Sequence, residues 1–285
     1  MTMEAAVTSL AKVADDICSL TLARRMAALL DRPSVALAQG DPLPRGWHVL
    51  MFNPPTSQSR LRHDGAAELG FDMPDLGLPR LMMGGRKIAF LGDIPIGASV
   101  VRRSTLGSVV RKNGRSGSFA LVEVEHVITL ENSGQQVLTE TVRYVLRPST
   151  EGAARVKPLE IPQTIDTTHD VPENALMRTF LATEEMLFRY SAITDNPHRI
   201  HYDHPYATLV EGYPALVVNG SLPQMVLLEM FREYAGREPA GLDSRNRGPI
   251  YCGSPVYLSI SKQGDCFALS ARDANGALAI EATAW

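Results

Sequence analysis

Two groups of alternating segments constrain the fold of this chain more than any other feature. In each group, three segments alternate apolar and polar side chains with a period of two, as half-buried β-strands do. Turn residues such as Asn113-Gly114 and Asn275-Gly276 separate the segments within a group. Each group therefore predicts an antiparallel meander. The segments are 96–114, 117–132 and 135–148 in the first group, and 255–263, 265–273 and 276–285 in the second.

An apolar helix is predicted ahead of the second group. Residues 216–236 read LVVNGSLPQMVLLEMFREYAG, with apolar side chains on nearly every face and Gly236 placed to end the helix. An earlier helix is predicted over residues 15–30, with Asp15 at its start and Pro33 just beyond its end. Each half thus has loops and a helix first and antiparallel strands last. An antiparallel sheet wrapped around one apolar helix, the hotdog arrangement, satisfies this order.

Two such halves predict an α+β double hotdog. We place the N-terminal hotdog domain, with the substrate pocket, at 1–150 and the C-terminal catalytic hotdog domain at 173–285. Residues 151–172 lack periodicity and contain several prolines, so they are predicted to be a linker. The Pro- and Gly-rich stretch 40–85 predicts loops around one or two short strands. The site is expected in the crevice between the halves.

Composition excludes several classes of function. With 28 basic and 31 acidic side chains and a formal charge of −3, the chain has no general positive field for nucleic acid. Its three cysteines form no CxxC pair, which argues against a disulfide framework or a cysteine zinc site. It has no secretion-signal pattern and no uninterrupted apolar run of roughly 18 residues. We therefore expect a soluble cytoplasmic protein with no membrane partner.

Three of the chain's seven histidines lie within residues 190–207, YSAITDNPHRIHYDHPYA. Their spacing of three could bring metal ligands onto one helix face. However, Pro197 and Pro205 oppose a continuous helix, and no glutamate completes an HExxH pattern, so no metal is expected. A polar loop without chemistry is another interpretation, since Asp, Asn, Pro and His are common in loops. The three residues are His198, His201 and His204.

Acid/base catalysis is the third interpretation of this segment. A histidine accepts a proton near neutral pH, and Asp195 or Asn196 can orient a water molecule beside it. Gly220, at the start of the apolar helix, can present its N–H to a developing oxyanion at the positive end of the helix dipole. Together these groups suit the addition or removal of water at a double bond conjugated to a thioester.

The segments YSAITDNPHRIHYDHPYA and EGYPALVVNGSL resemble the hydratase 2 motif of the MaoC-like hydratases and dehydratases. They are more similar still to a two-hotdog subgroup, which includes itaconyl-CoA and mesaconyl-CoA hydratases and type 2 hydroxyacyl-thioester dehydratases. In the first half, LPRLMMGGRKIAF, IGASVVRRS and KNGRSGSFALVEVEH are similar to that subgroup's N-terminal hotdog. The resemblance spans residues 45–285.

The resemblance implies an enoyl-CoA hydratase or 3-hydroxyacyl-CoA dehydratase that acts by syn addition or removal of water. His201 matches the catalytic histidine, and Gly220 matches the glycine whose N–H binds the thioester oxygen. In the one-domain hydratases an Asp stands five residues before the histidine. That position is Asn196 here, with Asp195 one residue earlier, so either can be the partner of His201. A short, branched dicarboxylic thioester such as itaconyl-CoA or mesaconyl-CoA is the implied substrate.

Two departures from the family bear on the substrate. Asn219 stands where the family has histidine, and Met83 stands where it often has tryptophan. Arg199 is interpreted either as a surface cation or as a ligand for a CoA phosphate or a substrate carboxylate, and Arg86 has the same two interpretations. The candidate substrate-binding residues are His198, Arg199, Asn219, Arg80, Met83 and Gly84.

No metal and no cofactor is implied, because the CoA thioester is itself the substrate. A homo-oligomer, dimeric or larger, is expected. Two other functions remain open at this point, since hotdog scaffolds also serve them: a non-catalytic acyl-thioester binding protein and a thioesterase.

Overall fold

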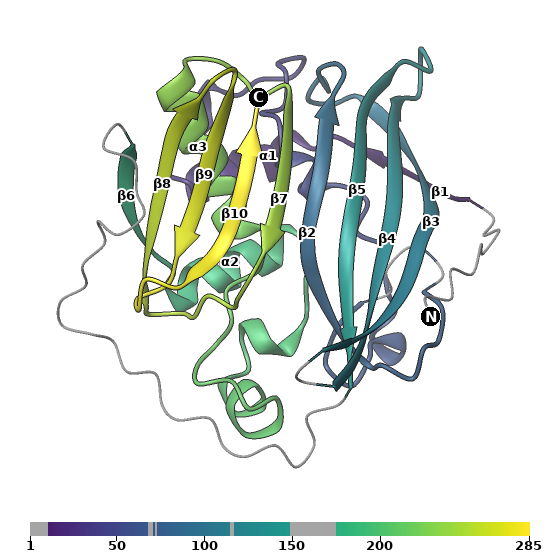
Figure 1. Ribbon diagram of the computed structural model, residues 1–285. Helices are drawn as coiled ribbons and strands as arrows, with labels where there is room; N and C mark the ends of the chain where they lie inside the picture. The colour runs from purple at the N-terminus through teal and green to yellow at the C-terminus, as the bar shows by residue number, and fades with distance from the viewer. Residues whose placement is uncertain (1–10, 68–70, 72, 115–116, 149–174) are drawn as a thin grey trace.

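The computed structural model describes residues 11–67, 71, 73–114, 117–148 and 175–285, so the linker predicted at 151–172 lies outside the described residues. Within these ranges ten strands form one antiparallel sheet in the order β1-β3-β4-β5-β2-β7-β10-β9-β8-β6 (Figure 1). The first five strands are β1 (Lys12–Ile17), β2 (Arg80–Phe90), β3 (Ser99–Gly114), β4 (Gly117–Leu130) and β5 (Gln136–Arg147). The others are β6 (Leu176–Leu181), β7 (Gly241–Asn246), β8 (Pro255–Gln263), β9 (Cys266–Arg272) and β10 (Leu278–Ala284).

The helices lie behind the sheet in Figure 1 and supply much of the core. They are α1 (Leu20–Leu29), α2 (Glu184–Ile193) and α3 (Leu222–Ala235). Short helical turns are η1 (Ser34–Ala36), η2 (Trp47–Leu50), η3 (Gln58–Arg60), η4 (Arg199–His201) and η5 (Tyr206–Val210). None of the helices in this part of the chain has the length and hydrophobicity needed to span a membrane.

Helix α3 has the buried character that its sequence predicts. Residues Leu222 to Phe231 are all buried, and the helix packs against β8 and β9. It ends at Gly236, whose φ of 66° is the left-handed conformation that favours glycine at a helix end. The six alternating segments are confirmed as β3, β4 and β5 and as β8, β9 and β10.

The prediction of a helix from residue 15 was wrong at its start. Residues Lys12–Ile17 form β1, which pairs antiparallel with β3 from Ser104 to Ser99. This pairing satisfies backbone groups of β3 that would otherwise face an open sheet edge. The helix begins only at Leu20, after Ser19, whose hydroxyl accepts a hydrogen bond from the Leu22 N–H.

The two halves join where β2 pairs with β7, with Gly85 opposite Arg245. Gly85 has a φ of 141°, and a Cβ placed there would lie 2.1 Å from the Ser244 carbonyl oxygen. Between Met83 and Gly85 the pairing of β2 with β5 also shifts register, so Gly84 is the extra residue of a β-bulge. The Gly-Gly pair therefore permits both the close approach and the bulge.

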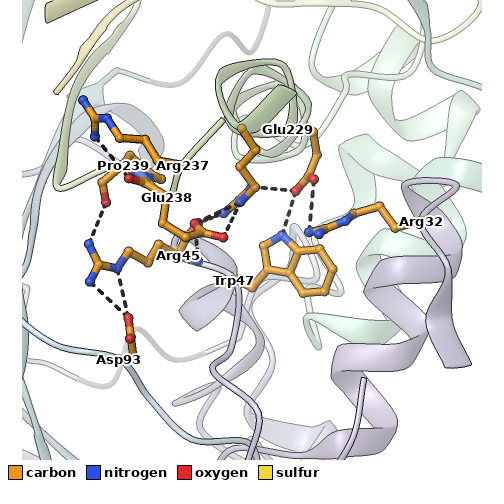
Figure 2. A network of polar contacts seen from close by, with 9 residues as sticks. Arg32, Arg45, Trp47, Asp93, Glu229, Arg237, Glu238 and Pro239 are labelled. Atoms are coloured by element: carbon orange, nitrogen blue, oxygen red, sulfur yellow. Dashed lines mark hydrogen bonds and ion pairs between the residues drawn. The ribbon is translucent and has the colours of Figure 1, made fainter. Parts of the chain in front are cut away.

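A polar network ties α3 to the segment before β2 (Figure 2). Glu229 of α3 accepts a hydrogen bond from the Trp47 indole N–H at 3.2 Å and pairs with Arg32 at 3.2 Å. It also pairs with Arg232 on the next turn at 2.7 Å. Arg232 in turn bonds the carboxylate of Glu238 and the carbonyl of Arg45. One buried carboxylate therefore holds partners from both halves.

The Glu229→Gln variant tests this network. The amide keeps the shape of the side chain but removes the charge that balances two guanidinium groups, so we expect the free energy of unfolding to fall by about 2 kcal/mol. Chemical denaturation measures the change. Glu233→Gln in the same helix is the matched control, because Glu233 and its partner Arg178 are both exposed and should contribute little. Equal losses of unfolding free energy in the two variants would contradict the stabilising role assigned to the Glu229 network.

The Gly85→Ala variant tests the join between β2 and β7. Because the new methyl group collides with a backbone carbonyl that cannot move alone, we expect a loss of about 3 kcal/mol in the free energy of unfolding. Gly248→Ala is the control, since a Cβ there meets no heavy atom within 4 Å. Thermal or chemical unfolding measures the stability of both variants. If both were as stable as the parent protein, the steric constraint at Gly85 would be ruled out.

Candidate active site

A cavity of about 330 Å³ lies between the two halves, near the lower end of the size range of ligand pockets. Strands and loops of the first half line much of it, and α2 with the segment after it lines the rest. Polar lining residues from the first half include His48, Asp64, Arg86, Arg102, His126 and Glu140. Those from the second half include Tyr190, Thr194, Asp195, Asn196, His198 and Ser221.

The β-bulge brings two of the lining residues to the same side of β2. Side chains of a regular strand alternate between faces, so Met83 and Arg86, three residues apart, would point to opposite sides. The extra residue at Gly84 shifts the alternation by one position, so Met83 and Arg86 point to the same side of β2. Both side chains line the cavity. Gly84 itself is not among the lining residues; its contribution is the bulge.

The segment after α2 lies at the cavity with a sharply turned backbone. Asp195 has a φ of 45° and an exposed side chain. Asn196 is half-buried, and its side-chain oxygen accepts a hydrogen bond from the His198 N–H at 3.2 Å. Both residues line the cavity, and neither is hydrogen-bonded to His201 within the described structure. The Asn196 amide nitrogen remains available as a donor.

His201 is buried and has a defined tautomer. Its Nδ1 lies 2.7 Å from the Val217 carbonyl oxygen, which can only accept, so Nδ1 carries the proton and Nε2 has the free lone pair. Burial lowers the pKa of His201 to about 4, although the bond to Val217 opposes part of that shift. The imidazole is therefore neutral at neutral pH. It is not among the cavity-lining residues and lies edge-on to His198, with ring centroids 5.6 Å apart.

His198, rather than His201, lines the cavity directly, and its acidic neighbour comes from the first half of the chain. His198 Nε2 lies 3.9 Å from a carboxylate oxygen of Asp64, which is itself buried. Burial lowers the pKa of His198, whereas the Asp64 charge acts in the opposite direction. The Asp64 carbonyl also accepts a hydrogen bond from the Arg199 N–H at 2.8 Å. Nothing in the sequence around Asp64 indicated this contact, because it joins segments more than 130 residues apart.

The start of α3 lies close to β2 and β7. A Cβ on Gly220 would lie 3.2 Å from the terminal methyl group of Met83. The side-chain amide of Gln224 donates to Asn246 at 3.0 Å, and the Asn246 amide donates to the Met83 carbonyl at 2.9 Å. These bonds connect the helix to both strands. Among the described residues, no acceptor is bonded to the Gly220 N–H.

Asn219 is fully buried, and its side chain does not cap α3. Its amide donates to the Ser191 hydroxyl at 3.4 Å, and Ser221 occupies the cap position without a side-chain bond. Ser221 lines the cavity and accepts a hydrogen bond from the Tyr190 hydroxyl at 2.7 Å. Because Asn219 bonds into α2, it links the two helices next to the cavity.

Three of the residues selected from the sequence lie outside the cavity lining, and two of them bind other side chains of the protein. Arg199 forms a two-point contact with Asp203 at 2.9 and 2.8 Å, and its guanidinium stacks on the Tyr206 ring. Arg80 bonds the Glu211 carboxylate at 3.1 Å and the Tyr213 hydroxyl at 3.0 Å. His204 is exposed. No set of three or more His, Cys, Asp or Glu side chains in the described ranges is arranged to hold a metal ion.

The inner wall of the cavity carries a charged cluster that the sequence analysis largely missed. Glu140 of β5 pairs with Arg86 at 3.3 Å and with His48 at 3.4 Å, and all three are buried. Burial alone would raise the pKa of Glu140, but the charges of Arg86 and His48 lower it well below its usual value. Opposite Glu140 in the sheet, His126 is buried beside the Ser104 hydroxyl, and burial lowers its pKa to about 4.

This chain is similar to known proteins in both sequence and structure. A family model described as hydroxyacyl-thioester dehydratase type 2 matches residues 46–252. The chain is similar to the mesaconyl-C(4)-CoA hydratase of Chloroflexus aurantiacus, with 36% identity over 272 residues that cover 95% of this chain and 93% of that protein.

Solved structures share the architecture. The MaoC-like dehydratase of Phytophthora capsici matches with a TM-score of 0.69 and 14% identity, covering 97% of this chain and 94% of that one. A Mycobacterium tuberculosis protein described as having a double hotdog fold matches with a TM-score of 0.60 and 11% identity, covering 100% and 94%. At such identities these structures show the fold alone. They confirm the predicted double hotdog class, while the domain boundaries stay a prediction.

The neutral buried histidines predict how stability depends on pH. The pKa of a histidine in the unfolded chain is about 6.5, whereas burial lowers the pKa of His126 and His201 to about 4 in the folded protein. Between these values the unfolded state binds more protons, so stability is lost as pH falls from about 6.5 towards 4. Each histidine contributes at most about 1.4 kcal/mol per pH unit to this loss.

His126→Gln should therefore flatten the dependence of unfolding free energy on pH across this window, whatever its effect at pH 7. Denaturant titrations at pH 7, 6, 5 and 4.5 measure the slope. The exposed His204→Gln variant is the matched control. An unchanged slope in His126→Gln would show that the pKa of His126 in the folded protein is not lowered below its value in the unfolded chain.

Proposed function

We infer that this chain, which belongs to the hydroxyacyl-thioester dehydratase type 2 family, adds water to or removes water from a short, branched, dicarboxylic acyl-CoA thioester. Membership of the family, drawn first from the motifs, is confirmed by the match and makes the chain a hydro-lyase acting on acyl-CoA. The relative from Chloroflexus aurantiacus is described as a mesaconyl-C(4)-CoA hydratase, and we propose mesaconyl-C4-CoA as a substrate here too. Itaconyl-CoA is a second candidate of the same chemical class.

One observation carries the mechanism: a buried histidine of defined tautomer lies behind a cavity-lining histidine, next to the start of a buried helix. His201 is neutral and has a free Nε2 lone pair, as a general base requires. His198 lies between it and Asp64 at the cavity wall. In our proposal His201, assisted by His198 and Asp64, takes a proton from a water molecule as the water oxygen attacks the β carbon of the acyl group.

Gly220 supplies the electrophilic part of the proposed mechanism. Attack at the β carbon moves an electron pair onto the thioester oxygen and gives an enolate. The Gly220 N–H, at the positive end of α3 and without a partner among the described residues, donates to that oxygen. The proton removed from water then returns to the α carbon from the same face, which completes a syn addition. Dehydration is the reverse of these steps.

Asn196 is the better supported partner for the water molecule. Its side-chain oxygen already accepts a hydrogen bond from the backbone N–H of His198. This bond fixes the amide so that its nitrogen can donate to a water oxygen in the cavity. Asp195 also lines the cavity, but its side chain is exposed. We propose that Asn196 orients the water and that the carboxylate next to the histidines is Asp64 rather than Asp195.

The His201→Ala variant tests the proposed base. We expect wild-type protein to remove the enoyl absorbance of mesaconyl-C4-CoA without releasing thiol, and His201→Ala to lower kcat/KM at least about 100-fold. Asp64→Asn should lower it by about 10-fold, mainly through kcat, because the substrate does not need that charge to bind. His204→Ala should leave it unchanged. Circular dichroism and thermal unfolding check that each variant folds.

Other results of the same assays would indicate one of the two alternative functions. Thiol release without hydration would indicate a thioesterase, and binding of acyl-CoA with neither reaction would indicate a non-catalytic binding protein. Full hydration by His201→Ala would sink the proposed mechanism. The cytoplasmic location, the homo-oligomeric assembly and the lack of a cofactor stay predictions.

A further inference from the structure

The inner wall of the cavity holds polar and charged side chains where the sheet pattern would place core residues. Arg102 of β3, His126 of β4 and Glu140 of β5 share the cavity face with the apolar Ile128 and Val142. Charged groups are costly to remove from water, and replacing a buried ion pair by apolar residues is often neutral or stabilising. A cluster of this kind beside a ligand cavity therefore points to a function in binding.

One part of the cluster is balanced within itself. The Glu140 carboxylate engages Arg86 through one oxygen at 3.3 Å and His48 through the other at 3.4 Å. Arg86 also lies 3.2 Å from the Met83 sulfur, and its backbone N–H bonds the Ser244 hydroxyl. These contacts orient Arg86, while Glu140 Oε1 and Arg86 Nε make no hydrogen bond within the described residues.

Arg102 is not balanced. Within the described residues its guanidinium makes no hydrogen bond and no ion pair, and its Nε is buried without a partner. Burial lowers the pKa of Arg102 and the Glu140 and Asp16 charges act in the opposite direction, yet neither carboxylate forms an ion pair or hydrogen bond with Arg102 among the described residues, so a direct anionic partner is lacking there. Because a guanidinium buried in this way loses hydration, a ligand that restores its hydrogen bonds would bind strongly.

The surroundings of Arg102 direct what it can bind. The Phe52 ring covers its planar face, with the guanidinium carbon 5.0 Å from the ring centroid. Phe52 has a φ of 63°, unusual for an aromatic residue, and its N–H is held by the Asp16 carboxylate at 2.6 Å. With its face covered, the guanidinium can offer only the N–H groups along its edge, which match the two oxygens of a carboxylate.

We propose that Arg102 binds the free carboxylate of a dicarboxylic acyl group and thereby selects acyl-CoA thioesters that carry a second carboxylate. The proposal rests on the proposed function, because it assumes that the acyl chain enters this cavity. Arg86, held by Glu140, adds a second positive charge beside the same position. Apolar Ile128 and Val142 contact the carbon chain. A monocarboxylic acyl group would leave the Arg102 edge unpaired.

Two saturated thioesters test the proposal without any reaction. Succinyl-CoA and butyryl-CoA have acyl chains of the same length and differ only in a terminal carboxylate or methyl group. Titration calorimetry on the full chain gives the ratio of their dissociation constants. We expect wild-type protein to bind succinyl-CoA about 10- to 100-fold more tightly.

Arg102→Met keeps an unbranched apolar stem and removes the charged guanidinium, so it should reduce that ratio at least about 10-fold. Arg102→Lys keeps the charge but not the planar fork, and should restore only part of the preference. Arg103→Met is the matched control: Arg103 is the next residue of β3, is exposed, and should leave the ratio unchanged. If Arg102→Met fails to fold, Arg102→Gln and Arg102→Lys supply the comparison.

The outcomes separate this proposal from the catalytic one. Equal binding of the two thioesters by wild-type protein, or an unchanged ratio in the Arg102 variants, would overturn the assignment of Arg102 even if hydration is observed. A preference for succinyl-CoA that depends on Arg102 would support it even if His201→Ala proved fully active. Loss of the preference in Arg103→Met as well would reveal a general charge effect and contradict a specific site.

Discussion

The close approach of β2 to β7 at Gly85 is the constraint on which the rest of this structure depends. A side chain there would collide with the Ser244 carbonyl, so only glycine lets the two five-strand halves form one sheet. The adjacent bulge at Gly84 then turns Arg86 to the same side as Met83. The join between the halves and the wall of the cavity are therefore consequences of the same two residues.

The cavity has two ends with different electrostatics. At one end, His198 lines the cavity with the buried, neutral His201 next to it, and the start of α3 offers an N–H donor, which suits proton transfer and oxyanion binding. At the other end, Glu140 keeps its charge because of the neighbouring Arg86 and His48, and Arg102 forms no ion pair with any described residue. A thioester at the first end and a carboxylate at the second would place one acyl chain across both halves. The double hotdog is then a means of assembling one site from two sheets.

The motif of the second half was readable because its chemistry is local. His198, His201 and Asn196 lie within six residues, and the roles proposed for them rest on side-chain type and on the turn that holds them. The alternating segments and α3 were equally readable, since their periods reflect burial on one face or on all faces. In contrast, β7 was not predicted as a strand, and β2 only begins within the stretch 40–85, which was expected to hold one or two short strands. They lie at the centre of the sheet, and their polar and glycine-rich sequences lack alternation because bulge and close approach replace it.

The sequence by itself determined the fold class, the strands with clear alternation, the buried helix and the histidine motif, because each depends on periodicity or on neighbours along the chain. Only the tertiary structure decided that Asp64 meets His198 and that Arg102 faces a cavity with no hydrogen-bond or ion-pair partner among the described residues. Both depend on contacts between segments far apart in sequence, and no local pattern encodes such contacts. The start of β1 shows the same limit: residues with helical spacing became a strand because the edge of β3 offered backbone partners.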